Sequence, residues 1–258
     1  MRLMKRILSA AAVLALSASL LVGCSSGTAS SVPVSASSAA ESTVSSVEET
    51  ASSAVDENEA AAAQLLNDLT GSYQELWPVI LADEYKQTWL DDCTALVGED
   101  NAEAAFEKLS SMVTGDVYGE DAVKAYANGG GAYFCGFTNS LAILTFDGET
   151  STISGTDKDG NVLFSHTYHY IGMEPVRGLY EFQSDDADSG EFTYFFLAPD
   201  TSAETYHIEF RYGSDADALS QYDAGDYAYW LASGISTDCD QTMIDNCIEL
   251  FCAENLAG

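Results

Sequence analysis

The chain has 258 residues, of which 9 are Lys or Arg and 41 are Asp or Glu, so its formal net charge at pH 7 is −32. A chain this negative lacks the basic surface that nucleic-acid binding needs, and it is not drawn electrostatically to anionic lipid, which excludes both as general functions. Apolar residues make up 47% of the chain, with 14 Tyr and 11 Phe, which excludes a wholly disordered acidic protein.

The first 24 residues have the pattern of an export signal. Residues 1–6 are basic, residues 7–22 are apolar, and Leu21-Val22-Gly23-Cys24 ends the run. The apolar stretch is shorter than a membrane span of about 20 residues, as is typical of secretory signals. The LVGC ending resembles the lipobox of bacterial lipoproteins, which implies removal of residues 1–23, acylation of Cys24 and a lipid-anchored location on the extracellular side of the cell membrane. The alternative is an ordinary signal peptide with a chance cysteine.

Residues 24–58 are predicted to be a flexible tether that begins with the lipidated Cys24. Residues 25–55 contain 12 Ser and no aromatic residue, and no apolar face repeats along them. A segment of this composition cannot offset the entropy of ordering its backbone. Residues 59–258 contain no second linker of this kind and are predicted to form one folded domain.

Along this domain, helical patterns come first and strand patterns follow. Apolar spacing predicts helices at Ala60–Leu69, Asn101–Val113 and Glu120–Asn128, and a closing helix at Asp238–Glu254. In the second helix, Ala105, Phe106, Leu109 and Met112 share the predicted apolar face. Aromatic and β-branched runs, separated by Asp-Gly turn signals at 147–148 and 159–160, predict strands at 132–147, 162–171, 179–183, 191–197 and 204–212.

The last of these strands carries a clear two-sided pattern. Thr205, His207, Glu209 and Arg211 share one face, and Tyr206, Ile208, Phe210 and Tyr212 share the other. Because the second set is apolar, we expect the first set to face either water or a polar cavity, as in a barrel with a polar interior or a sheet with one wet face.

No sequence pattern of a nucleophile paired with a base, of a phosphate-binding loop or of a zinc protease occurs, so the chain is predicted not to be an enzyme. Of the three histidines, His166 and His169 lie three residues apart on one predicted strand and therefore on opposite faces, so they cannot bind one ion together. His207 shares its face with Glu209, which is a weak signal for a metal-binding pair.

Two further groups of residues leave alternatives open. The acidic stretch 184–191 has oxygen ligands for a hard cation but lacks the spacing of a calcium loop, so a solvated hairpin loop is favoured. After Cys24, five cysteines remain, at 93, 135, 239, 247 and 252. The last three are expected either to pack as small apolar residues or to bridge to Cys93 or Cys135.

Four stretches in this order resemble the ZinT/YodA family, whose domain also ends some zinc-uptake lipoproteins. The family's G-x-W-x-S-V-Y-P opening is similar to residues 71–78 (GSYQELWP), its Y-x-Y-x-G strand to 168–172 (YHYIG) and its V-R-Y-L-F-E strand to 176–182 (VRGLYEF). Its ending is similar to Ala198-Pro199, His207, Gly213-Ser214-Asp215 and the cluster Tyr227, Tyr229 and Trp230. The likeness covers about residues 68–234.

The resemblance implies a mainly β fold with added helices: a lipocalin-like (calycin) antiparallel β-barrel, preceded by helices and closed by a C-terminal helix. It also implies that the protein is a binding protein that recruits or buffers zinc outside the cell membrane and works with a metal-uptake transporter or its binding protein. The family binds zinc through three histidines at the barrel mouth.

The chain departs from the family at this site. Only His207 remains of the family's H-F-H motif, which here is Thr205-Tyr206-His207, and Phe195-Phe196-Leu197 stands where a third histidine is expected. We expect His207 to be the main ligand, with Glu209 and His169 as further candidates, for zinc or another divalent cation. The alternative is a calycin-type ligand-binding or interaction module that has lost the metal site. A hydrolase is the least supported alternative.

Overall fold

The computed structural model describes residues 57–198 and 207–256. Cys24, the predicted signal, nearly all of the predicted tether and residues 199–206, which include Thr205, lie outside the described residues, so the predictions about them stay predictions. Within the described residues, no helix is both long and apolar enough to cross a membrane.

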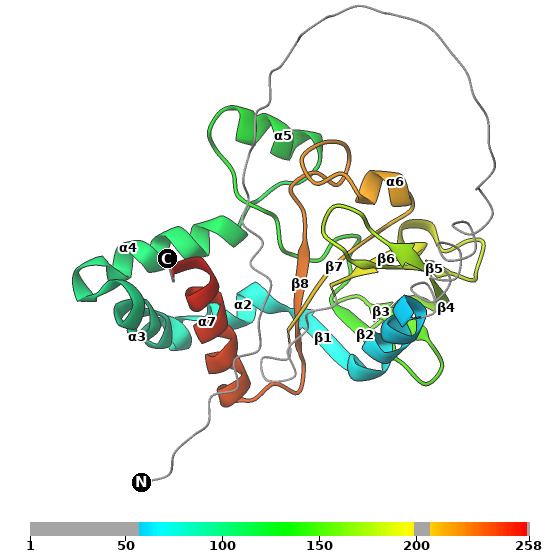
Figure 1. Cartoon of the computed structure of the whole chain (residues 1–258), viewed down its shortest axis with the longest axis horizontal. Coiled ribbons are helices and arrows are strands. Elements are labelled where there is room, and N and C mark those ends of the chain that lie inside the picture. The colour runs from blue at the N-terminus through cyan, green and yellow to red at the C-terminus, as the bar shows by residue number, and fades with distance from the viewer. Residues whose placement is uncertain (1–56, 199–206, 257–258) are drawn as a thin grey trace, which may run out of the picture. The chain divides into compact units, whose positions relative to one another are not determined.

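Eight strands of the described chain form a closed antiparallel barrel in which each strand pairs with its neighbours in sequence order, as Figure 1 shows. The strands are β1 (Gly71–Glu75), β2 (Ile143–Asp147), β3 (Thr152–Thr156), β4 (Val162–Met173), β5 (Tyr180–Ser184), β6 (Tyr194–Leu197), β7 (His207–Gly213) and β8 (Ala232–Ser236). The barrel closes where β1 pairs with β8, with Tyr73 opposite Ser236 and Glu75 opposite Gly234. The predicted antiparallel barrel with added helices is confirmed.

Aromatic side chains fill the inside of the barrel, because every second residue of a strand points inward and these positions are apolar. Phe195 shows the packing: its ring centroid lies 5.8 Å from that of Phe164, 5.4 Å from Tyr168 and 5.3 Å from Tyr212. The core side chains that are exposed by 5% or less include Phe146, Ile153, Phe164, Phe182, Phe195 and Phe210.

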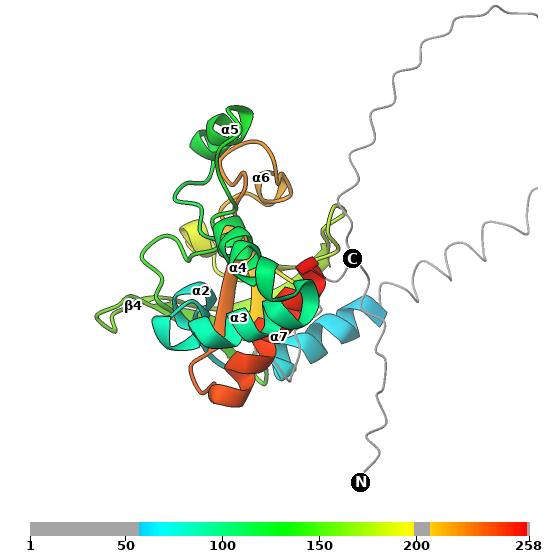
Figure 2. The same ribbon diagram turned by 90° about the vertical axis from the view of Figure 1, so that its left-hand side faces the viewer.

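A second core lies between the helices that follow the two closing strands. Among the described residues, the helices are residues 57–68, α2 (Leu76–Ile80), α3 (Lys86–Val97), α4 (Glu99–Val113), α5 (Glu120–Ala127), α6 (Ala216–Leu219) and α7 (Gln241–Leu256), with short 3-10 turns η1 (Asp83–Tyr85) and η2 (Gly190–Phe192). Figure 2 shows α3, α4 and α7 gathered on one side of the molecule. Trp89 is fully buried among them, and its indole N–H donates to the carbonyl oxygen of Ile80 at 2.7 Å.

The predicted helices at 60–69, 101–113, 120–128 and 238–254 correspond to observed ones, and so do the strands at 162–171, 179–183 and the described part of 204–212. Three details of the prediction were wrong. Only Ile143–Asp147 of the run 132–147 is a strand. Residues 190–192 form η2, so β6 begins at Tyr194. Met112 is 40% exposed, and Val113 takes its place on the buried face of α4.

The barrel core predicts the effect of removing one of its rings. Replacing Phe195 by Ala leaves a cavity that surrounding strands cannot close, so we expect the free energy of unfolding to fall by about 3–5 kcal/mol. Val162→Ala is the control, because Val162 is 70% exposed and its truncation should cost no more than about 0.5 kcal/mol. Urea unfolding followed by circular dichroism measures both, and equal losses in the two variants would contradict this account of the core.

Candidate functional site

The two histidines of β4 lie on opposite faces of the strand, as their spacing predicted, and each forms a close pair with an aspartate. His166 Nδ1 lies 2.7 Å from Asp186 Oδ2, and His169 Nδ1 lies 2.6 Å from Asp185 Oδ1. His166 is the more buried, with its side chain 17% exposed, whereas the His169 side chain is 53% exposed. The two pairs therefore present one imidazole toward the barrel core and one toward solvent.

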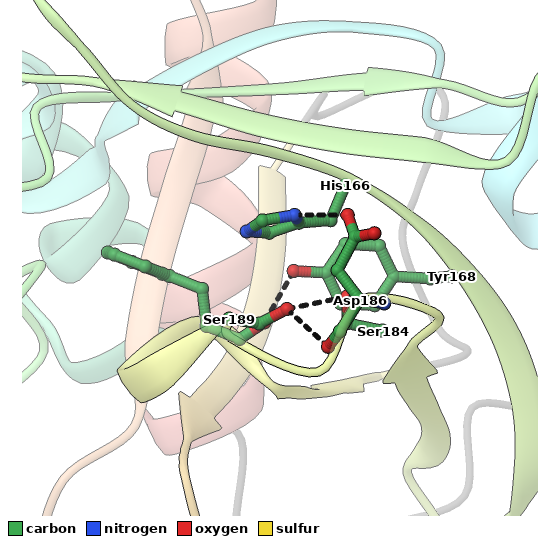
Figure 3. A network of polar contacts seen from close by, with 6 residues as sticks. His166, Tyr168, Ser184, Asp186 and Ser189 are labelled. Atoms are coloured by element: carbon green, nitrogen blue, oxygen red, sulfur yellow. Dashed lines mark hydrogen bonds and ion pairs between the residues drawn. The ribbon is translucent and has the colours of Figure 1, made fainter.

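The loop after β5 holds the two aspartates in place, as Figure 3 shows for Asp186. The backbone N–H of Asp186 donates to Ser184 Oγ at 3.1 Å, and Ser189 Oγ donates to Ser184 Oγ at 2.7 Å and to the Asp186 carbonyl at 3.0 Å. Ser184 and Ser189 are both buried. The predicted hairpin loop at 184–191 is therefore an ordered turn in which Asp185 and Asp186 are each paired with a histidine of β4.

These pairs determine which ring nitrogen of each histidine is left for a ligand. An ionised carboxylate only accepts hydrogen bonds, so Nδ1 of His166 and His169 carries the proton that is shared with the aspartate. In the neutral ring, Nε2 then has the free lone pair. Histidines that bind metals commonly have this arrangement, because a carboxylate on one nitrogen orients the other and increases its basicity.

His207 and Glu209 share one face of β7, and this face points away from the barrel interior. In the β7–β8 ladder, His207 is opposite Ile235 and Glu209 is opposite Ser233. The other face carries Ile208, Phe210 and Tyr212, which are buried in the barrel core. Of the two arrangements that the pattern left open, the polar barrel interior is therefore excluded for β7: its aromatic set faces inward, and His207 and Glu209 face outward.

Glu209 lies close to the helical layer, and its charge is felt by two buried thiols. Burial raises the pKa of both Cys135 and Cys247 to about 12, and the negative charge of Glu209 adds to the rise. Both side chains belong to the core between the helices. Glu209 is half-buried on the outer face of β7, on the side that faces the core between the helices.

His207 and Glu209 share a face of β7, whereas His169 lies on β4 and is paired with Asp185. No three or more His, Cys, Asp or Glu side chains of the described residues are grouped so that they could hold one metal ion. The ligand set of His207, Glu209 and His169 therefore stays a prediction, and the described residues do not by themselves provide a complete tetrahedral site for zinc.

Arg211, the last residue of the polar set on β7, faces neither water nor a polar cavity, which corrects that expectation. It is fully buried, and its guanidinium donates to the carbonyl oxygens of Leu219, Gln221 and Tyr227. Burial lowers the pKa of the guanidinium. Arg211 thus binds the segment after β7 to the outside of the barrel.

A tyrosine ring joins Arg211 to a second arginine. The guanidinium carbon of Arg211 lies 4.3 Å from the ring centroid of Tyr222, and that of Arg177 lies 4.5 Å from the same centroid. The Tyr222 hydroxyl donates to the buried carboxylate of Glu174 at 3.3 Å. No sequence pattern indicates this cluster, although Arg177 lies in one of the stretches that resemble the family.

A cavity of about 360 Å³ lies outside the barrel. Four segments line it: the end of β1, α2 with the residue that follows it, the end of α4 with the two residues that follow it, and residues 134–136. The lining residues are Glu75, Trp77, Pro78, Leu81, Val113, Thr114, Gly115, Phe134, Cys135 and Gly136. The buried Nε1 of Trp77 has no hydrogen-bond partner in the described chain. The cavity is mainly apolar, with the Glu75 carboxylate as its charged group.

Comparison with known proteins gives likeness in fold only. No family model matches the chain, and no curated protein sequence matches it. The Zn(II)-bound ZinT-like domain of Streptococcus pneumoniae AdcA is 14% identical, with a TM-score of 0.46, and the match covers 71% of this chain and 89% of that chain. Zn(II)-bound AdcA from Streptococcus pneumoniae is 13% identical, with a TM-score of 0.43, over 72% of this chain and 35% of that chain.

The burial of the Arg211 guanidinium predicts that replacing this residue lowers the stability of the fold, although Arg211 is not a candidate metal ligand. Replacing Arg211 by Met leaves three carbonyl oxygens without their donor, so we expect the free energy of unfolding to fall by roughly 2–4 kcal/mol. Lys158→Met removes the same charge from an exposed turn and should change it by less than about 0.5 kcal/mol. Thermal unfolding by calorimetry compares the two; a similar small change in both would show that Arg211 is dispensable.

Proposed function

We propose that the chain is an extracytoplasmic lipoprotein, anchored by an acylated Cys24, whose barrel domain binds a divalent cation, zinc first. It would recruit or buffer the metal at the cell surface and pass it to a metal-uptake transporter or its binding protein. The lipobox-like LVGC sequence and the Ser-rich tether support the location. The four family-like stretches, with His207 at the position of a family ligand, support the cargo.

The observation that carries this proposal is the pair His207 and Glu209 on the outer face of β7. Two residues apart on one strand face, an imidazole and a carboxylate can bind one ion, and both side chains are half-buried. With only two such ligands, water molecules would complete the coordination. Binding should therefore be weaker than at a site with three histidines and more tolerant of other divalent cations.

His169 provides a second, separate position for a cation. Its Nδ1 is bound to Asp185, its Nε2 is the remaining ligand atom, and its side chain is half-exposed. β4 and β7 are not neighbours in the barrel. His169 and His207 are therefore tested as separate positions and not as two ligands of one site.

The test is a calorimetric titration of the purified, chelator-treated full chain with Zn²⁺, repeated with Ca²⁺. We expect binding to one principal site, with affinity reduced about tenfold or more by His207→Ala and by Glu209→Gln, because each removes a ligand. His169→Ala should have a smaller effect. Asp188→Asn is the control, since it removes an equally negative but exposed charge from the 184–191 loop.

Weak binding of several Zn²⁺ ions, unchanged in His207→Ala and Glu209→Gln, would contradict the proposal. The 41 carboxylates would then be attracting cations over the whole surface. Loss of binding in His169→Ala alone would move the site to β4 and would likewise contradict the assignment to β7.

The cavity beside Trp77 favours a second candidate function, the binding of a small organic molecule. Its volume of about 360 Å³ is within the range of small-molecule sites, and its lining is mainly apolar with a few polar groups. Trp77 lines this cavity, and a rotation of its ring that exposed the buried Nε1 would let it donate to an acceptor on an apolar ligand. This places the alternative binding site outside the barrel, whose core is occupied by aromatic rings.

Filling the cavity tests this candidate. Leu81 lines the cavity, so Leu81→Trp should occupy part of its volume and block ligands. Leu96→Trp is the matched control, because Leu96 lies on α3 and is 41% exposed. In a thermal-shift screen of aromatic fragments that carry a carbonyl acceptor, we expect hits that stabilise the wild type and Leu96→Trp but not Leu81→Trp. Hits that stabilise all three chains equally would exclude the cavity as their site.

A further inference from the structure

Two buried cysteines from distant parts of the chain meet inside the helical layer. Cys93 lies on α3 and Cys252 lies on α7, 159 positions later in the sequence, and both side chains are fully buried. Their Sγ atoms are 3.9 Å apart, close enough for one thiol to donate a hydrogen bond to the other. In Figure 2, α3 and α7 lie together on the same side of the molecule.

The other three cysteines of the domain have no such neighbour among the described residues. Cys135 contacts the carbonyl oxygen of Tyr133, at 3.9 Å, and not another thiol. All five cysteines of the domain, Cys93 and Cys252 included, are free thiols in the structure. Of the pairings that the sequence left open, Cys93 with Cys252 is the one whose sulfur atoms lie within hydrogen-bond distance among the described residues.

We propose that Cys93 and Cys252 form a disulfide bond that joins α3 to the C-terminal helix α7. The two sulfur atoms must approach from 3.9 Å to a bond length of about 2.05 Å, which small rotations about the two Cα–Cβ bonds and slight movement of the helices can supply. A disulfide at this place is protected from reductants, because neither sulfur is accessible to solvent in the folded chain.

The bond forms by exchange with an external disulfide, such as oxidised glutathione or the oxidised form of a thiol–disulfide oxidoreductase. One cysteine thiolate attacks a sulfur of the oxidant and releases the first thiolate of that oxidant. The second cysteine thiolate then attacks the mixed disulfide and releases the other thiolate. The two cysteines lose two protons and two electrons, and the oxidant gains both and becomes two thiols. Because both thiols are buried in the native chain, the exchange takes place during folding.

The inference does not depend on the proposed cation site. The pair lies on α3 and α7 and shares no residue with the proposed site on β7 or with His169 on β4, so zinc binding and disulfide formation can fail independently. It also explains how the helical layer is stabilised in an exported chain: the bond closes a loop of 159 positions and restricts the unfolded state.

The experiment unfolds the full chain in denaturant with a reductant and refolds it in a mixture of reduced and oxidised glutathione. Remaining thiols are blocked under denaturing conditions, and digested peptides are identified by mass spectrometry. We expect one linked pair of peptides, carrying Cys93 and Cys252, with a mass lower by two hydrogen atoms than the reduced pair. We also expect the oxidised chain to melt roughly 5–15 °C above the reduced chain.

Cys252→Ser should lose both the linked peptides and the difference in melting temperature between oxidising and reducing conditions. Cys247→Ser is the matched control, because Cys247 is also buried on α7, and it should keep both. Complete blocking of Cys93 and Cys252 in the refolded wild type would overturn the proposal, and so would a dominant link between either residue and another cysteine. The peptide map of the wild type alone decides whether the bond forms. The proposal can therefore be tested even if a variant fails to fold.

Discussion

The pairing of β1 with β8 is the constraint on which the other parts of the structure depend. It closes the sheet, so that no strand edge of the barrel is left open, and it brings the two ends of the domain together. Because α2 follows β1 directly and α7 follows β8, closure also sets the helices of the second core against one side of the barrel. The cavity beside Trp77 and the meeting of α3 with α7 both follow from this arrangement.

A filled barrel limits where binding can take place. The inward positions of β2 to β7 carry mainly aromatic and aliphatic side chains that contact one another, so most of the interior stabilises the fold, and the inward imidazole of His166 is already paired with Asp186. Chemistry is therefore left to the outer strand faces, to the ends of the barrel and to the layer between barrel and helices. Three such places hold the candidate sites: His169, the pair His207 and Glu209, and the cavity. Because these sites lie apart, each candidate function can be tested by its own substitutions.

The sequence predicted those elements in which local pattern and tertiary environment agree. In β4 and β5, apolar and polar residues alternate along the strand. The helices α4 and α7 are long enough to show the helical spacing of apolar residues, and the Asp-Gly turns lie where the chain reverses direction. β8, with the sequence Ala-Ser-Gly-Ile-Ser, has almost no strand propensity and is held by its two neighbours, so no local signal reveals it. The alternation of β7 predicted correctly that His207 and Glu209 share a face. It could not predict that Arg211 on that face is buried, because the carbonyl oxygens that bind it come from a later segment.

The surroundings of the outer face of β7 differ from one end of the strand to the other. This difference limits where on the strand the proposed cation site can lie. At the end of β7, Arg211 is enclosed by carbonyl oxygens and by the ring of Tyr222. In the middle, Glu209 is half-buried near the thiols of the helical layer, and at the start His207 is half-buried as well. A divalent cation near Arg211 would be repelled by the guanidinium and would find no room among these contacts. At the proposed cation site, an ion would therefore enter from the side of His207, with Glu209 as its inner ligand, because that half of the face combines an imidazole, a carboxylate and partial exposure to solvent.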